Sequence, residues 1–150
     1  MKKKLMLSLS LFVLFTFTGF AQENLPDKIL GTWLIENKES KIEIFRKGNT
    51  FNGILLWSKE MYEADGKTSR KDVNNKDAAL RLRDLRNLPL VSGFVYNGSE
   101  WKNGTIYDIK SGENYSCIIK MNGPNSMLVR GYVGIALPGK TVSFSSVKNQ

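Results

Sequence analysis

The chain has 150 residues, with 22 lysines and arginines against 14 acidic residues, a formal net charge of +8 and no histidine. The absence of histidine removes the commonest general base, the commonest zinc ligand and the Ser-His-Asp triad together. A single cysteine, Cys117, excludes an internal disulfide. Apart from a short arginine-rich stretch at Arg81, Arg83 and Arg86, the basic residues are scattered rather than clustered with aromatic side chains. The sequence therefore predicts no nucleic-acid partner.

Residues 1–21 predict a cleaved secretory signal peptide. Lysines at positions 2–4 precede an apolar run that extends to Phe17, and Ala21 supplies a small residue at the cut. The run is shorter than the roughly 20 apolar residues that a membrane span needs, so we expect no stable membrane insertion. Without the leader, 19 basic and 14 acidic residues leave a net charge of +5. Residues 22–150 would then form one exported domain, periplasmic or extracellular.

Eight short β-rich runs follow, and most are separated by turn sequences that contain Gly, Asn or Pro. The runs cover residues 31–36, 41–46, 51–57, 90–96, 102–108, 114–121, 126–133 and 141–147. Short strands punctuated in this way are typical of antiparallel sandwiches and barrels. Eight strands suit a closed barrel that is filled by side chains or holds one small ligand. We therefore predict an all-β fold, a single antiparallel barrel of about eight strands, with the Trp33 indole sealing one end.

The connection over residues 59–89 interrupts the pattern of strands. Residues 59–77 are polar and charged and predict a long loop, which is uncommon in a compact domain unless it has a function or is disordered. Asp77 is a suitable cap for one short helix over residues 77–86. The apolar face of that helix would comprise Ala78, Leu82 and Leu85. Such a helix either closes one mouth of the barrel or is a surface excursion between two strands.

A dense cluster of oxygen-bearing side chains lies in this connection, at Asp72, Asn74 and Asn75. It does not match an EF-hand, because Asp77 stands where the motif needs Gly and Arg83 where it needs Glu. A looser calcium site is a disfavoured alternative, and we predict no metal and no other cofactor. Asp and Asn in such a pattern more often bond nearby backbone amides and pin a loop. An enzyme using Asp72 and Arg83 is the weakest functional hypothesis and requires both side chains in one cleft.

Arg130 lies in the middle of a β-rich run, so its side chain must face solvent, pair with an acid or lie over an aromatic ring. The indole of Trp33 is a candidate for that ring, and we favour a structural role for Arg130 over ligand binding. If the barrel holds a ligand, Arg130 is the candidate partner for an acidic head group. The candidate apolar contacts of that ligand are Trp33, Trp57, Tyr107, Tyr115 and Tyr132.

Six segments carry a family resemblance: Gly31-x-Trp33, Asp72-x-Asn74-Asn75, and the stretches 81–89, 101–108, 111–115 and 128–134. They span nearly the whole chain after the leader. Together they resemble the bacterial domain of unknown function 2147. The resemblance implies an exported, lipocalin-like β-barrel and supplies no activity. Lys76, Ile109 and Phe144 stand where the family usually has Pro, Pro and Trp, which affects loop geometry more than the fold.

Two functions follow as expectations. The first is a non-enzymatic binding module that holds a small apolar or amphipathic ligand. The alternative is an envelope protein whose barrel is filled and whose loop over residues 59–77 engages another protein. Neither the ligand nor the oligomeric state follows from the sequence.

Overall fold

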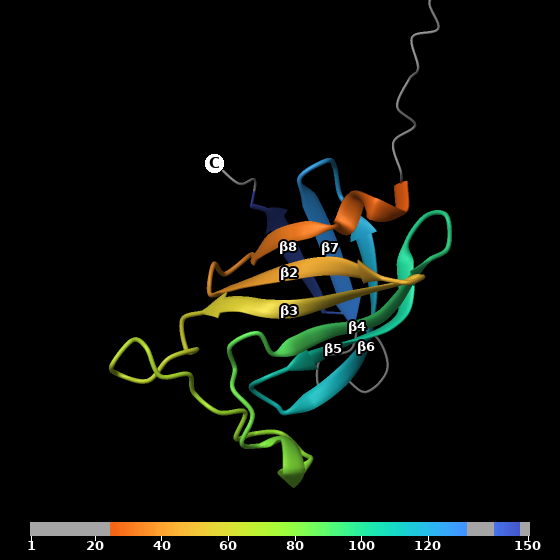
Figure 1. Ribbon diagram of the computed structural model, residues 1–150. Coiled ribbons are helices and arrows are strands. Elements are labelled where there is room, and N and C mark those ends of the chain that lie inside the picture. Colours follow the sequence, from red (N-terminus) through yellow and green to blue (C-terminus); the bar gives the residue numbers. More distant parts are fainter. Residues whose placement is uncertain (1–24, 132–139, 148–150) are drawn as a thin grey trace, which may run out of the picture.

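Eight antiparallel strands close into a barrel in which each strand pairs with its neighbours in the chain and β8 pairs with β1. The structure is a computed structural model that describes residues 25–131 and 140–147 (Figure 1). The strands are β1 (Gly31–Ile35), β2 (Ser40–Lys47), β3 (Thr50–Ser58), β4 (Pro89–Tyr96), β5 (Trp101–Asp108), β6 (Glu113–Met121), β7 (Ser126–Gly131) and β8 (Thr141–Ser146). The predicted lipocalin-like, eight-stranded barrel is confirmed. The predicted signal peptide lies outside the described residues.

One end of the barrel is closed by a short 3₁₀ helix, η1 (Leu25–Ile29), which the sequence reasoning did not predict. The buried indole of Trp33 donates a hydrogen bond from Nε1 to the carbonyl oxygen of Ile29 at 2.9 Å. The indole Nε1 of Trp101 likewise donates a hydrogen bond to the carbonyl oxygen of Pro26 at 3.1 Å. Two aromatic side chains from strands on different parts of the wall thus fasten the helix over this end, and the predicted indole seal is confirmed. Neither described helix is long and apolar enough to cross a membrane.

The interior next to this closed end is filled by aromatic side chains. Phe51 and Phe94 are fully buried, and the ring of Phe51 meets the ring of Trp101 edge-on with centroids 6.4 Å apart. Gly104 is buried on β5, and any Cβ there would overlap the ring of Phe94. Glycine at this position therefore lets the Phe94 ring lie directly against the backbone of the neighbouring strand β5.

A β-bulge in β3 changes which side chains face inward near the other end, the mouth. Lys41 pairs with Trp57 but the next residue, Ile42, pairs with Leu55, so Leu56 is the extra residue. Because the bulge shifts the alternation by one, Trp57 turns outward with 37% of its surface exposed. Ser58 takes the inward position, opposite Ser40 of β2. Two small serines therefore line the mouth where a tryptophan was expected.

The segment between β3 and β4, residues 59–88, folds back on itself beside the mouth, and Figure 1 shows it on the opposite side of the barrel from η1. Tyr62 pairs with Ser69, and Lys71 pairs with Asp84, as isolated β-bridges. The predicted helix over residues 77–86 is a single 3₁₀ turn, η2 (Ala78–Leu80).

The cap of this turn was predicted correctly, because the Asp77 side chain accepts a hydrogen bond from the Ala79 amide at 2.9 Å. The predicted apolar face was wrong. Leu85 is buried, whereas Leu82 is 81% exposed. The reason is that residues 83 and 84 pair in extended conformation with residues 71 and 72, and a helix could not continue through that pairing.

The contact between Gly104 and Phe94 predicts a specific packing defect. We expect Gly104→Ala to destabilise the barrel by ~1–3 kcal/mol, because the added methyl group forces the Phe94 ring from its place. Adding Phe94→Leu to the same chain should recover part of that loss, since the smaller side chain vacates the space. Urea unfolding of the two single variants and the double variant measures this coupling. Strict additivity of the two losses would contradict the packing described above.

Candidate functional site

A pocket of about 510 Å³ opens at the mouth of the barrel beneath the 59–88 segment. Its apolar lining comes from both the barrel and the connecting segments: Ile35, Leu55, Val73, Leu85, Leu90, Tyr107 and Ile109. Ser40, Ser58 and Asn74 complete the wall, and three acidic and three basic residues border it: Glu60, Glu63, Asp108, Arg70, Lys71 and Lys110. An apolar hollow with charged groups at its border is the usual form of a small-molecule site. We refer to it as the mouth pocket.

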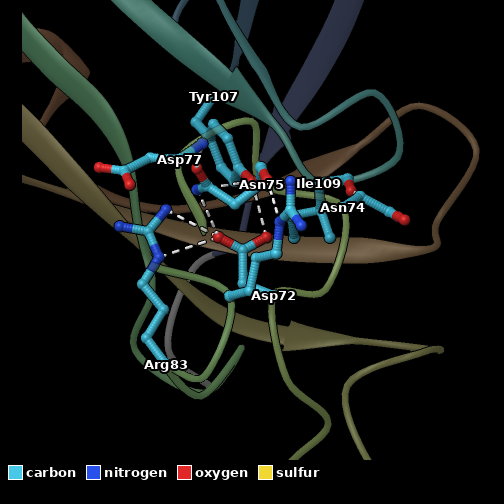
Figure 2. Close-up of polar contacts among 8 residues, drawn as sticks. Asp72, Asn74, Asn75, Asp77, Arg83, Tyr107 and Ile109 are labelled. Atoms are coloured by element: carbon cyan, nitrogen blue, oxygen red, sulfur yellow. Dashed lines mark hydrogen bonds and ion pairs between the residues drawn. The ribbon is translucent and has the colours of Figure 1, made fainter. Parts of the chain in front are cut away.

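One wall of the mouth pocket is held in place by the carboxylate of Asp72, which is completely buried. Its Oδ1 accepts a hydrogen bond from the Tyr107 hydroxyl at 2.6 Å. Its Oδ2 accepts hydrogen bonds from Nδ2 of Asn75 at 2.8 Å and Nε of Arg83 at 2.9 Å. Figure 2 shows the carboxylate turned toward Arg83 on one side and toward Asn75 on the other. We refer to these four residues as the latch, since they join the 59–88 segment to β5.

Tyr107 is the barrel's contribution to the latch. Counting from the inward-facing Gly104, alternation along β5 places Tyr107 on the outer side of the strand, close to the mouth. The 59–88 segment covers it there, and only 6% of the residue is exposed. The guanidinium of Arg83 also lies over its ring, with Cζ 5.2 Å from the ring centroid.

Burial, the hydrogen bond to Asp72 and the negative charge of Asp72 together raise the pKa of Tyr107 to about 12. Nearby Arg83 and Asn75 oppose this change. The phenol therefore stays protonated above the pH at which an ordinary tyrosine ionises, and it continues to donate to the carboxylate there.

Backbone contacts extend the latch to the turn between β5 and β6. The amide side chain of Asn74 donates to the carbonyl oxygen of Ile109 at 3.1 Å, and the amide of Lys76 donates to the carbonyl oxygen of Gly112 at 3.3 Å. Gly112 has a φ of +72°, and a Cβ at this position would overlap the carbonyl group of Asn74. Two separate reasons, backbone conformation and close approach, therefore require glycine here.

The structure brings together the four residues of the predicted loop cluster and disperses most of the predicted ligand contacts. Asp72, Asn75 and Arg83 form the latch, and Asn74 lies beside it. The interpretation that this cluster pins a loop is confirmed, because Oδ1 of Asn75 also accepts from the Asp77 amide at 2.9 Å. Of the predicted aromatic contacts that the structure describes, Tyr107 is the one that borders the mouth pocket.

The remaining predicted contacts lie elsewhere. Trp33 is buried at the closed end, and Trp57 faces outward because of the bulge. The hydroxyl of Tyr115 lies 3.0 Å from Oγ of Ser111, so it braces the turn before β6. Arg130 is exposed on the outer face of β7, between the buried Val129 and Gly131. Its predicted stacking on Trp33 was wrong for that reason. Tyr132 lies outside the described residues.

Asp72 and Arg83 are adjacent, as the enzyme hypothesis required, but the carboxylate has no exposed surface. Arg83 borders a second, polar hollow of about 510 Å³ on the outer side of the barrel, together with Ser92 and Asn114. Both carboxylate oxygens of Asp72 already accept hydrogen bonds from the protein, from Tyr107, Asn75 and Arg83. The arrangement can fasten a segment, and its carboxylate is not accessible to solvent.

Sequence reasoning missed Ser40 and Ser58 as pocket residues. Small inward residues carry no chemical signal, and the bulge that brings Ser58 inward has no signature in the run Ile54-Leu55-Leu56-Trp57. The partnership of Tyr107 with Asp72 was missed too, since 35 residues separate the two.

A closed barrel with a pocket at one mouth and a helix across the other end defines a lipocalin-like protein. A solved structure with this fold is protein HP1028 from Helicobacter pylori, described as belonging to the lipocalin family. It is 20% identical to this chain with a TM-score of 0.67, and the alignment covers 81% of this chain and 84% of HP1028. At that identity the likeness shows the fold alone.

The chain belongs to the DUF2147 family, described as uncharacterized proteins conserved in bacteria, whose sequence pattern matches residues 31–145. The resemblance inferred from the sequence is thereby confirmed. A search of curated proteins gave no significant match.

The latch predicts a distinctive alkaline response. A tyrosine in an unfolded chain ionises near pH 10, and the pKa of Tyr107 is raised to about 12 in the folded protein. Between these values the unfolded chain releases a proton that the folded chain retains, so the free energy of unfolding falls as the pH rises. In an ultraviolet absorbance titration, we expect one late-ionising tyrosine that Tyr107→Phe removes.

The matched control is Tyr115→Phe, which deletes a hydroxyl from the neighbouring strand and should leave the late ionisation in place. At neutral pH, Tyr107→Phe should cost ~1–3 kcal/mol of stability, because a buried carboxylate oxygen loses its donor. A late ionisation that persists in Tyr107→Phe would rule out this assignment.

Proposed function

We propose that this protein is an exported, non-enzymatic binding protein that holds a small apolar or amphipathic molecule in the mouth pocket. The observation that carries the proposal is the contrast between the two ends of the barrel. Aromatic side chains fill the closed end, whereas Leu55, Leu90 and two serines leave about 510 Å³ open at the mouth. Sites for small organic ligands typically have volumes of about 300–1,000 Å³.

The lining of the mouth pocket favours an amphipathic ligand over a purely polar one. The deepest part is aliphatic, with Leu55, Leu85 and Leu90 each no more than 8% exposed. Charged groups stand at the border, where Arg70 pairs with Glu63 at 3.6 Å and both side chains are about half exposed. An apolar chain would occupy the inner part, and a polar group would remain at the border, where water and both charge signs are available.

The test is a pair of matched serine substitutions. Ser40→Phe places a ring in the mouth pocket, whereas Ser145→Phe adds the same ring at an exposed position on the outside of β8. With cis-parinaric acid as the fluorescent probe, we expect Ser40→Phe to weaken binding at least tenfold, about 1.4 kcal/mol, and Ser145→Phe to match the unmodified protein. Native mass spectrometry of the purified protein should also detect co-purifying lipid.

Thermal unfolding of both variants checks that the barrel remains intact. Binding that is equally strong in Ser40→Phe and Ser145→Phe would place the probe outside the mouth pocket. The absence of any probe binding and of any co-purifying lipid would refute the proposed function.

A further inference from the structure

The 59–88 segment exposes several large apolar side chains that do not contribute to the core of the barrel. Among the described residues, the most exposed large apolar side chains are Leu82 at 81% and Val73 at 65%, and Leu80 nearby is 39% exposed. Single exposed apolar residues are ordinary on protein surfaces, but three within ten residues of one segment form a patch.

The latch fixes the direction in which this patch points. Lys71 pairs with Asp84, and the amide of Asp72 donates to the carbonyl oxygen of Arg83 at 3.0 Å. These two stretches of the segment therefore run antiparallel to each other. The side chains of Asp72 and Arg83 turn inward to the latch. Their neighbours Val73 and Leu82 lie in turns at the two ends of the intervening loop, and both side chains are exposed. The Asp72–Arg83 ion pair and the exposed apolar residues therefore belong to the same short pairing.

The surroundings of the patch are cationic. Residues 71–86 contain five basic and three acidic side chains, a net charge of +2. The three acids are all engaged within the segment: Asp72 in the latch, Asp77 as the cap of η2 and Asp84 with Lys71 at 2.6 Å. Lys76, Arg81 and Arg86 of this segment are exposed. Lys76 lies 3.9 Å from Glu113, Nε of Arg81 donates to the carbonyl oxygen of Asn75 at 2.8 Å, and all three side chains keep their positive charge at the surface.

We propose that this face, formed by Val73, Leu80, Leu82, Lys76, Arg81 and Arg86, docks on an anionic lipid surface. The three apolar side chains would enter the interfacial layer, and the basic side chains would meet lipid phosphates. A stable protein partner needs roughly 800 Å² on each side, an area that three loop side chains do not supply. The patch is small, and its charge complements an anionic bilayer, so the lipid surface is the better match.

Docking in this way has a direct consequence for the mouth pocket, and it rests on the function proposed above. Val73 belongs to both sites, since it lines the mouth pocket and is one of the two most exposed members of the patch. A protein held by this face would therefore have the pocket opening beside the bilayer. The ligand class is thereby narrowed to amphipathic molecules that reside in or pass through a lipid surface.

The experiment is sedimentation of the purified protein with vesicles. We expect binding to phosphatidylcholine vesicles that contain about one third phosphatidylglycerol, little binding to pure phosphatidylcholine, and release of the protein at about 0.5 M salt because the charge attraction is screened. Arg86→Gln should weaken binding about fivefold, the effect of about 1 kcal/mol for one basic residue. Leu82→Asn should weaken binding by a similar or larger factor.

The matched control is Val95→Thr, which removes a comparable apolar group, 39% exposed, from the outer face of β4. It should bind vesicles like the unmodified protein. Equal binding by Leu82→Asn, Arg86→Gln and Val95→Thr would overturn the proposal. So would an absence of vesicle binding accompanied by self-association that Leu82→Asn abolishes, since the face would then be a contact between two copies of this chain.

Two further measurements separate this proposal from the proposed function. Leu82→Asn should bind cis-parinaric acid in solution as the unmodified protein does, because Leu82 does not line the mouth pocket. Ser40→Phe should bind vesicles normally, because Ser40 lies inside the pocket. Vesicle binding without probe binding would support the docking proposal and refute the proposed ligand-binding function. Probe binding without vesicle binding would support the proposed function and refute docking.

Discussion

The burial of one carboxylate governs how the connecting segment is arranged. Asp72 has no exposed surface, and a carboxylate removed from water is costly unless every oxygen finds donors. The donors come from three places: Asn75 in the next turn, Arg83 eleven residues along, and Tyr107 on the barrel wall. Satisfying this one group therefore closes the segment upon itself and fastens it to β5 at the same time. Hydrogen bonds to a charged group contribute ~1.5–3 kcal/mol each, so the latch defines one position for a segment that has little other regular structure.

The barrel itself depends on where its strands depart from strict alternation. The extra residue in β3 turns Trp57 outward and leaves Ser40 facing Ser58 at the mouth. At the closed end, glycine at position 104 lets Phe94 approach the backbone of β5. The bulge in β3 leaves small side chains at the mouth, and the glycine in β5 makes room for an aromatic ring in the packed interior. The same eight-stranded wall can hold both a packed core and a pocket because its side-chain volume is distributed unequally along the axis.

The strands could be predicted from the sequence because each is a short alternating run with its own turn signals, and that information is local. The seal by Trp33 was also predictable, since an aromatic residue at the start of the first strand has few other places to go. The faces of Trp57 and Arg130 were not recoverable in the same way. Trp57 faces outward because of a bulge that depends on how β3 pairs with β2. Whether Arg130 meets solvent, an acidic side chain or an aromatic ring depends on which face of β7 is turned toward the barrel interior.

The candidate site shows the same division between local and distant information. The Asp72, Asn74 and Asn75 pattern was interpreted correctly as a pinned loop, because Asx side chains act on neighbouring amides. Its attachment to Tyr107 joins residues 35 positions apart and has no local signature. The helix expected over residues 77–86 failed for a related reason. Its local pattern was sound, but pairing of Asp72 with Arg83 satisfies a buried charge, and that requirement outweighs a weak helical propensity.

The latch also constrains how the proposed ligand would reach the mouth pocket. Lifting the whole 59–88 segment would separate Asp72 from Tyr107, which lies on the barrel. The carboxylate of Asp72 would then lose a hydrogen-bond donor, which is costly for a buried charge. By contrast, the ion pairs bordering the pocket, such as Arg70 with Glu63, are about half exposed and contribute little to stability. The inner wall of the pocket is therefore held firmly, and its border can yield at small cost. Val73 follows Asp72 directly, lines the mouth pocket and is exposed in the patch. A molecule leaving a lipid surface at this face would therefore arrive beside the pocket, on the side that the latch holds.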